Sequence, residues 1–301
     1  MDFLKRYPIP IAGLILSCFA LGNLLQSYGD NVRLAIGVIG FVLLIPFVLK
    51  LIVMNKALKE EFQNPVIASV FLTFTMALIC FAGYVKIFFE SAGLVIWYVG
   101  TIGHVLLLLW FSAKFLLHFS IKKVFPSWFI VYVGVAVASV TSPSMKQLFV
   151  GQITFYLAFV CYLSILPFVC YRVWKVKDIP EPARPTLIIL SAPASLLLAG
   201  YLSAFPSKNA LILSLLVILS FTFYIIALCY LPILLRMKFT PGYSAFTFPL
   251  VISGIATKML NGYFKKSYII LDVVSRIEEG IAVLIVAWVL VCYLFFLAKK
   301  K

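Results

Sequence analysis

The sequence predicts an all-α integral membrane protein that forms one polytopic domain over residues 1–301. Apolar residues occupy 64% of the positions, the mean hydropathy is +1.12, and only 12% of the residues are charged, where a soluble domain carries about 25%. Ten apolar stretches, each long enough to cross a hydrocarbon core of ~30 Å, follow one another with short connections. Because backbone amides in lipid must be hydrogen-bonded within the segment, such stretches are helices.

Helix-start and turn residues separate the ten predicted spans. They lie at residues 8–27, 33–54, 65–85, 92–116, 126–145, 150–173, 184–205, 209–235, 242–262 and 269–297. Proline-containing start signals precede the third, fifth, seventh and ninth spans, at Asn64-Pro65, Pro126-Ser127, Pro180-Glu181-Pro182 and Pro241-Gly242. The first apolar run is helix-length and lacks an Ala-x-Ala cleavage site, so it is interpreted as a span. Short connections make successive helices antiparallel neighbours, which gives five hairpins.

The distribution of basic residues predicts the orientation. The side that holds both termini carries 17 Lys and Arg residues and the opposite side carries 8. Cytoplasmic loops are the ones enriched in Lys and Arg, so both termini are expected in the cytoplasm of a cell whose plasma membrane the chain crosses repeatedly. Two cytoplasmic termini require an even number of spans, and ten satisfies this.

The odd spans differ in character from the even spans. Odd spans carry small, hydroxyl and proline residues, whereas even spans are more uniformly apolar and aromatic. Small residues let helices approach closely, and proline is tolerated where a neighbour or a water-filled cavity satisfies the freed carbonyl. Ordinary helix packing explains any single such residue, but their concentration in every second span predicts an inner ring of odd helices around a pore. The candidate pore-lining residues are Ser17, Thr73, Ser139, Ser191, Pro193, Thr247 and Ser253.

The charged residues indicate what such a pore would pass. The net charge is +15, and no carboxylate is expected deep in a span, with Glu278 and Glu279 coming closest. Cation and proton pathways normally use buried carboxylates, so an anion is favoured. Lys258 either extends to the interface or attracts anions to the outer mouth. His104, mid-span without a partner at metal-ligand spacing, is expected to be a packed, hydrogen-bonded histidine.

Other functional classes find little support in the residues. Ser, His and acidic residues form no catalytic triad, and neither a phosphate-binding glycine loop nor a metal-ligand cluster is present, so no enzyme activity, cofactor or metal is expected. A scaffold would not need five proline- and hydroxyl-bearing helices. The expected partners are small anions and membrane lipid, with no nucleic acid.

Four segments resemble the tellurite-resistance/dicarboxylate transporter (TDT) family, which includes the slow-type anion channels of plant guard cells. The first segment, in span one, runs from Ile9-Pro10-Ile11-Ala12-Gly13-Leu14 to Ala20-Leu21-Gly22, and the second is Pro126-Ser127-Trp128-Phe129 at the start of span five. The third is Pro182-Ala183-Arg184-Pro185-Thr186, followed by Ala192-Pro193 and Gly200-Tyr201. The fourth, in span nine, is Tyr243-Ser244-Ala245-Phe246-Thr247-Phe248-Pro249. With the ten-span layout, the resemblance extends over essentially the whole chain.

The resemblance implies a pseudo-fivefold arrangement of five hairpins, a central pore within each protomer, and a homotrimer. It also implies a phenylalanine plug in the ninth span, which falls at Phe248, facing a small residue of the first span, which falls at Gly13. The function so predicted is a channel or transporter for small anions such as chloride, nitrate, sulfite or dicarboxylates. A proton-coupled carrier of C4-dicarboxylates such as malate or succinate is the alternative.

Overall fold

The computed structural model describes residues 2–299, without the side chains of residues 2 and 55–57, and all regular structure in this range is helical. The α-helices are α1 (Asp2–Arg6), α2 (Ile11–Leu24), α3 (Asp30–Val53), α4 (Asn55–Glu61), α5 (Pro65–Phe71), α6 (Thr73–Val85), α7 (Glu90–Phe111), α8 (Trp128–Val133), α9 (Ala136–Thr141), α10 (Leu148–Tyr171), α11 (Ala192–Ala204), α12 (Ala210–Leu234), α13 (Thr247–Tyr263) and α14 (Ile269–Ala298). Short 3₁₀ and π segments precede, follow or connect these helices: η1 (Leu25–Tyr28), η2 (Ser112–Leu116), η3 (Ile121–Lys123), η4 (Arg172–Val176), η5 (Glu181–Ser191) and η6 (Pro241–Phe246).

Nine helical stretches within residues 2–299 are long and apolar enough to cross a membrane, as judged by length and composition. They correspond to nine of the ten predicted spans, and their ends agree with the prediction to within a helical turn. The fifth predicted span is the one without a counterpart among these long helices.

Residues 126–145 fold as two short helices, α8 and α9, that meet at Gly134. A Cβ atom at Gly134 would lie 2.7 Å from His104 Cε1 and 2.7 Å from Met76 Sδ, so only glycine permits this close approach to α6 and α7. Beyond the break, the Val137 amide donates to the Gly134 carbonyl three residues back, at 3.1 Å, as in a tighter helical turn. Close packing therefore interrupts a helix that hydropathy alone predicts to be continuous.

The odd and even spans differ sharply in burial. In the first, third, seventh and ninth spans, 67% to 89% of the residues in the most apolar 18-residue segment are buried inside the protein, against 28% to 33% in α3, α7, α10, α12 and α14. Helices α8 and α9 are buried nearly throughout. The spans rich in small, hydroxyl and proline residues are therefore the inner helices, and the more uniformly apolar spans are the outer helices.

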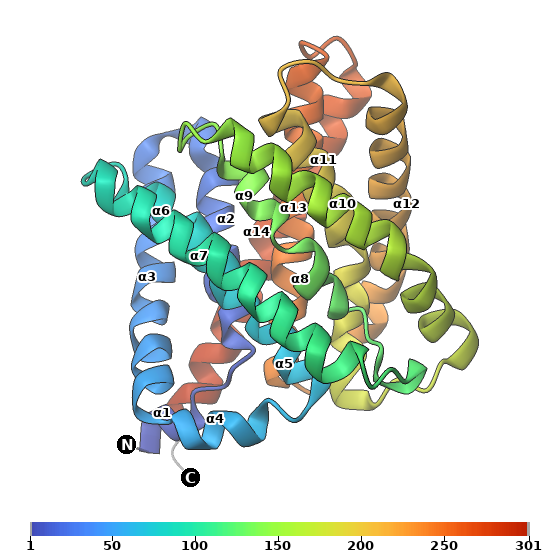
Figure 1. The fold of residues 1–301 in the computed structure, drawn as a ribbon. Coiled ribbons are helices and arrows are strands. Elements are labelled where there is room, and N and C mark those ends of the chain that lie inside the picture. The colour runs from blue at the N-terminus through green and yellow to red at the C-terminus, as the bar shows by residue number, and fades with distance from the viewer. Residues whose placement is uncertain (1, 300–301) are drawn as a thin grey trace.

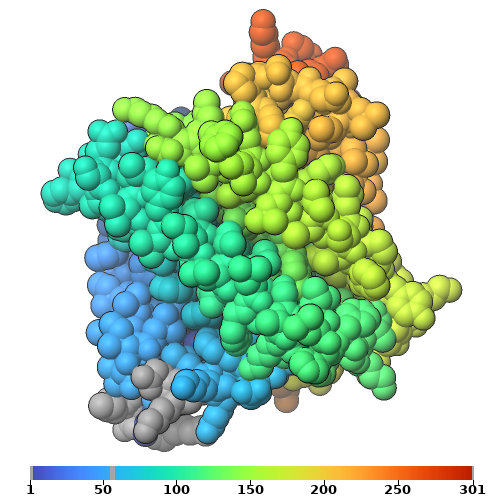
Figure 2. Space-filling model, in the orientation of Figure 1, coloured from blue at the N-terminus to red at the C-terminus, as the bar shows by residue number. Residues whose placement is uncertain are grey.

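The outward surfaces of the even helices are apolar. Helices α7 and α10 cross the near face of the molecule in Figures 1 and 2. Their exposed side chains include Val95, Val99, Ile102, Leu106, Phe149, Ile153, Tyr156 and Val160. A surface of this kind suits contact with lipid or with another apolar protein surface.

The inner segments pack against one another in a closed cycle. Helix α2 contacts α6, α6 contacts α9, α9 contacts α11, α11 contacts α13, and α13 contacts α2 again. Each outer helix packs on the inner helix that precedes it in the chain, namely α3 on α2, α7 on α6, α10 on α9, α12 on α11 and α14 on α13.

The two ends of the described chain lie together. The Arg6 guanidinium donates from Nη1 to the Lys299 carbonyl at 2.5 Å, and Figure 1 places α1 and the end of α14 at the same end of the bundle. A chain whose ends lie on one side crosses the bundle an even number of times.

Candidate functional site

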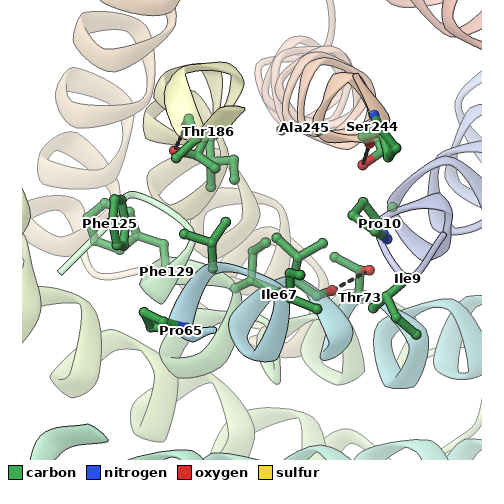
Figure 3. Close-up of a pocket in the computed structure, with 18 of the residues that line it drawn as sticks. Ile9, Pro10, Pro65, Ile67, Thr73, Phe125, Phe129, Thr186, Ser244 and Ala245 are labelled. Atoms are coloured by element: carbon green, nitrogen blue, oxygen red, sulfur yellow. Dashed lines mark hydrogen bonds between the residues drawn. The ribbon is translucent and has the colours of Figure 1, made fainter. Parts of the chain in front are cut away.

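A cavity of about 580 Å³ enters the bundle from the end that holds α1 and α4. All five inner segments supply its wall from the beginnings of their helices, as Figure 3 shows for the labelled side chains. We call this cavity the vestibule, and its wall includes Ile9, Pro10, Gly13, Pro65, Ile67, Thr73, Met76, Phe125, Phe129, Thr186, Pro193, Leu196, Ser244, Ala245, Phe248 and Pro249.

Proline explains why the inner segments begin where they do. Pro65 opens α5, and Pro241 opens η6, because proline lacks the amide proton that the first helical turn leaves unpaired. The 3₁₀ segments η5 and η6 pack against each other, and their irregular backbone borders the vestibule. Non-helical backbone at such a depth is tolerated where it lines a cavity. The first amides of α2, α11 and α13 are already paired, since those of Ile11, Ala12, Gly13, Ala192 and Thr247 each donate to a carbonyl three residues back.

Phe248 and Gly13, the pair that the resemblance implies, both line the vestibule. The Phe248 side chain is buried. A Cβ atom at Gly13 would lie 3.2 Å from Ser244 Cβ, one helical turn before Phe248. The missing side chain at Gly13 thus allows α2 to approach the start of α13 closely.

The hydroxyl groups of the vestibule wall are already engaged. Thr73 and Thr186 each donate to a carbonyl three residues back, at 2.7 Å and 2.6 Å, and Ser244 does so at 3.3 Å. These bonds are drawn in Figure 3. These hydroxyl groups donate their protons to backbone carbonyls of the helix, which leaves their oxygen lone pairs available to the cavity. The remaining wall is mainly apolar and offers few hydrogen-bond donors to the cavity.

Basic residues lie at the mouth of the vestibule. Lys122 and Lys123, in η3, line the cavity, as does Glu61. Lys50 Nζ binds the Glu61 carboxylate at 3.1 Å, which compensates this negative charge. The mouth therefore has a positive balance. In the sequence, Lys122 and Lys123 contribute to the orientation signal, although their position just before the fifth span could have identified them as residues of the mouth.

Two of the seven predicted pore-lining residues, Thr73 and Pro193, line the vestibule. The others are buried in helix contacts. Ser17 Oγ donates to Thr247 Oγ1 at 2.6 Å, and Ser139 Oγ lies 2.9 Å from Thr154 Oγ1. Carbonyl groups of their own helical segments accept the hydroxyl protons of Ser191, Thr247 and Ser253.

The apolar wall residues Met76, Ile130, Val133, Ile189 and Leu196 were not predicted as site residues. Nothing in the sequence marks them, because an apolar residue on an inner helix has the same pattern whether it faces a cavity or a neighbouring helix.

Lys258 is held by three acceptors near the end of α13 that lies away from the vestibule. Its Nζ donates to the Leu24 carbonyl at 2.8 Å, to Ser27 Oγ at 2.8 Å and to the Glu279 carboxylate at 2.6 Å. The side chain is 32% exposed. The Lys258 ammonium group therefore links η1, α13 and α14, and the Glu279 carboxylate compensates its charge.

Two single polar residues of the spans, His104 and Glu278, are buried. His104 is a packed, hydrogen-bonded histidine, as predicted, with Nδ1 2.7 Å from Thr75 Oγ1 and Nε2 3.1 Å from the Val131 carbonyl. Glu278, which the sequence places toward the outer end of the tenth span, is only 1% exposed, so this span contains a carboxylate that is buried inside the protein. Sequence position puts Glu278 in the first part of α14, and only packing against the neighbouring helices buries it.

Among the residues that the structure describes, no group of three or more His, Cys, Asp or Glu side chains is arranged to hold a metal ion. The site is therefore a cavity with a basic mouth and a mainly apolar wall that includes the aromatic side chain of Phe248.

Comparison with known proteins agrees with this arrangement. A family model described as "Voltage-dependent anion channel" (SLAC1) matches residues 7–296. A comparison with curated proteins found none that matches. The family match confirms the resemblance seen in the four motif segments and covers the whole helical bundle. The chain therefore belongs to the SLAC1 family of voltage-dependent anion channels.

Proposed function

We propose that the chain conducts small anions through a pore along the axis of its five inner segments, with Phe248 as the plug. One observation carries the proposal: the beginnings of all five inner segments form one vestibule, and Phe248 and Gly13 are part of its wall. Family membership supports anion passage and favours it over a proton-coupled dicarboxylate carrier.

The proposed architecture has ten crossings, arranged as five hairpins about a pseudo-fivefold axis. The closed cycle of inner contacts supports it, as does the packing of each outer helix on the preceding inner one. Helices α8 and α9 together supply the crossing that the nine long helices lack. The Arg6–Lys299 contact supports an even number of crossings.

The proposed gate works by excluding water. An aromatic ring across a narrow pore makes an anion lose hydration without compensation, which raises a steep barrier. Movement of the Phe248 ring would open the path, and the space available for that movement depends on the missing side chain at Gly13.

Selectivity for anions would come from a diffuse positive field. Lys122 and Lys123 at the mouth favour negative charge in the vestibule. This field attracts anions without binding any of them tightly, as conduction requires.

The proposal places the vestibule and both termini on the cytoplasmic side of the plasma membrane, because that side holds most of the basic residues. It also includes assembly as a homotrimer, for which the apolar faces of the outer helices offer surface. Cysteine labelling near residue 299 in intact cells tests the orientation, and labelling from outside would contradict it. Native mass spectrometry tests the trimer, and only monomers or dimers would contradict it.

The decisive experiment compares Phe248→Ala with Phe246→Ala in proteoliposomes, using chloride, nitrate, sulfite, malate and succinate as test anions. Phe248→Ala should raise flux strongly because it removes the constriction. Phe246 is fully buried and does not line the vestibule, so its replacement should cost about 3–5 kcal/mol of stability without raising flux. Unchanged flux in folded Phe248→Ala protein would refute the plug, and no anion flux from either protein would refute the channel.

A further inference from the structure

Buried polar side chains form a column along the side of α13 that lies opposite Phe248. Ser253, Thr257 and Asn261 follow one another at four-residue spacing, so they share one helical face. At about 100° per residue, Thr257 lies about 180° around the helix from Phe248. All three side chains are buried. We call this set the polar column, and its members from the neighbouring helices are Ser195, Ser220, Tyr224 and Glu278.

The polar column reaches from the middle of α13 to the outer end of the protein. At its inner end, Ser253 Oγ donates to the Pro249 carbonyl at 2.9 Å and lies 3.1 Å from Ser195 Oγ. At its outer end, Asn261 Nδ2 donates to the Asp272 carboxylate at 3.2 Å. Asp272 in turn binds Arg276, whose side chain is 75% exposed. The column thus runs along α13 from the residue after Phe248 toward Asp272 and the exposed Arg276.

Three polar atoms in the column have no hydrogen-bond partner: Tyr224 Oη, Asn261 Oδ1 and Glu278 Oε2. Each belongs to a side chain that is more than nine-tenths buried. A Cβ atom at Gly254, about one helical turn before Thr257, would lie 3.7 Å from the Glu278 backbone, so Glu278 lies against this part of α13. Buried polar atoms without partners are costly, so their concentration here points to a ligand that the protein atoms alone do not supply.

The charges around Glu278 leave its carboxyl group without a cation. Lys258 binds Glu279 at 2.6 Å, and Arg276 binds Asp272 at 2.9 Å. Each of these basic side chains is therefore paired with a carboxylate other than that of Glu278. The titratable and charged groups on the elements packed against α14 are Lys258 and Tyr263 on α13, Cys18 on α2 and Tyr243 on η6, with Tyr28 of η1 beside Lys258 and with Asp272, Arg276 and Glu279 on α14 itself.

We propose that Glu278 is a proton-binding site that fills from the outer surface through the polar column and controls anion flux. An ionised carboxylate buried without a counter-charge is strongly disfavoured, and a bound proton neutralises it. The protonated group also gains an O–H donor, which Tyr224 or a water molecule in the column can accept.

The bound proton acts on the pore across α13. Once ionised, Glu278 places a negative charge behind the helix that carries Phe248, where low polarity strengthens its repulsion of a passing anion. Protonated Glu278 removes this repulsion. Anion flux should therefore be high at acidic outer pH and fall as the outer solution becomes alkaline. This link to flux rests on the proposed channel function, whereas proton binding at Glu278 does not.

The first experiment measures anion flux at acidic and alkaline outer pH, in the Phe248→Ala background so that the plug does not mask the effect. Flux should fall about three- to tenfold with rising pH. Glu278→Gln, a neutral side chain of the same shape, should keep the high flux at both pH values, while Glu278→Asp should keep the pH response. Glu90→Gln removes an exposed carboxylate from the same side and should leave the response intact. An unchanged pH response in Glu278→Gln would overturn the proposal.

The second experiment is independent of transport. Infrared difference spectra of the reconstituted protein between acidic and alkaline pH should contain a carboxylic-acid carbonyl band that Glu278→Gln removes and Glu90→Gln retains. A spectrum without a band assignable to Glu278 would overturn proton binding even if anions flow. Conversely, absence of anion flux with the band present would refute the channel and leave the proton site established.

Discussion

Ser17 and Thr247 join α2 to α13 through a hydrogen bond of 2.6 Å between their hydroxyl groups, across 230 residues of sequence. Ser17 Oγ also lies 2.6 Å from the Gly13 carbonyl, and Thr247 directly precedes Phe248. The bond therefore joins the two segments that carry the proposed plug and its small partner.

Removal of this bond should weaken the contact between α2 and α13. Ser17→Ala and Thr247→Val should each lower the free energy of unfolding by about 0.5–1.5 kcal/mol, the range typical of hydrogen bonds between membrane helices. Because both variants break one bond, the double variant should lose less than the sum of the two. A double-mutant cycle in detergent measures this coupling, and strictly additive losses would show that the contact contributes nothing.

Gly13→Asp should suppress anion flux through the Phe248→Ala pore. The new side chain needs space that Ser244 already occupies, with 3.2 Å between a Cβ atom at residue 13 and Ser244 Cβ, and its charge repels anions. Gly262→Asp is the matched control, since nothing lies within 4 Å of a Cβ atom at that end of α13. Flux assays in proteoliposomes compare the two, and equal flux through both double variants would place the anion path away from Gly13.

Neutralising Lys122 and Lys123 together should slow the entry of anions from the vestibule side. The double Gln variant should lower flux by about two- to tenfold at low ionic strength, because both charges attract anions to the mouth. The difference should shrink as salt is added, since the Debye length falls to about 8 Å at physiological ionic strength. Lys175→Gln, an exposed residue that does not line the vestibule, is the control. A loss that salt does not reduce would contradict attraction by charge.

Lys258→Gln should act mainly on stability. It leaves the Glu279 side chain, which is 9% exposed, without its cation, and we expect a loss of about 1–3 kcal/mol. Glu279→Gln in the same chain should recover most of this loss because the uncompensated charge disappears. Thermal unfolding measures both, and Lys265→Gln, an exposed lysine at the same end, is the control. Reduced flux at unchanged stability would instead support the predicted role of Lys258 in attracting anions.

The sequence predicted the membrane-spanning helices well because hydropathy is a local property. Nine of the ten spans correspond to helices with ends within a turn of those predicted. The contrast between odd and even spans predicted which helices are buried, since small and hydroxyl residues concentrate where helices approach closely.

The fifth span departs from the prediction at Gly134, where atoms of its own segment and of other helices lie close together. Its hydropathy suits a continuous helix, yet the chain is broken at Gly134, where His104 and Met76 from other helices approach too closely for a side chain. A local pattern holds no information on which distant residues will pack there.

The sequence by itself determined the class, the approximate spans, their alternation and the family to which the motifs belong. Tertiary structure decided which faces of those helices line the vestibule. Thr73 faces it and Ser139 does not, although both are hydroxyl residues on inner helices. Glu278 is buried only because α14 lies against α13. The physical reason is common to these cases: hydropathy sums over a whole segment, whereas the rotation of a helix about its axis is set by side-chain contacts between segments far apart in the chain.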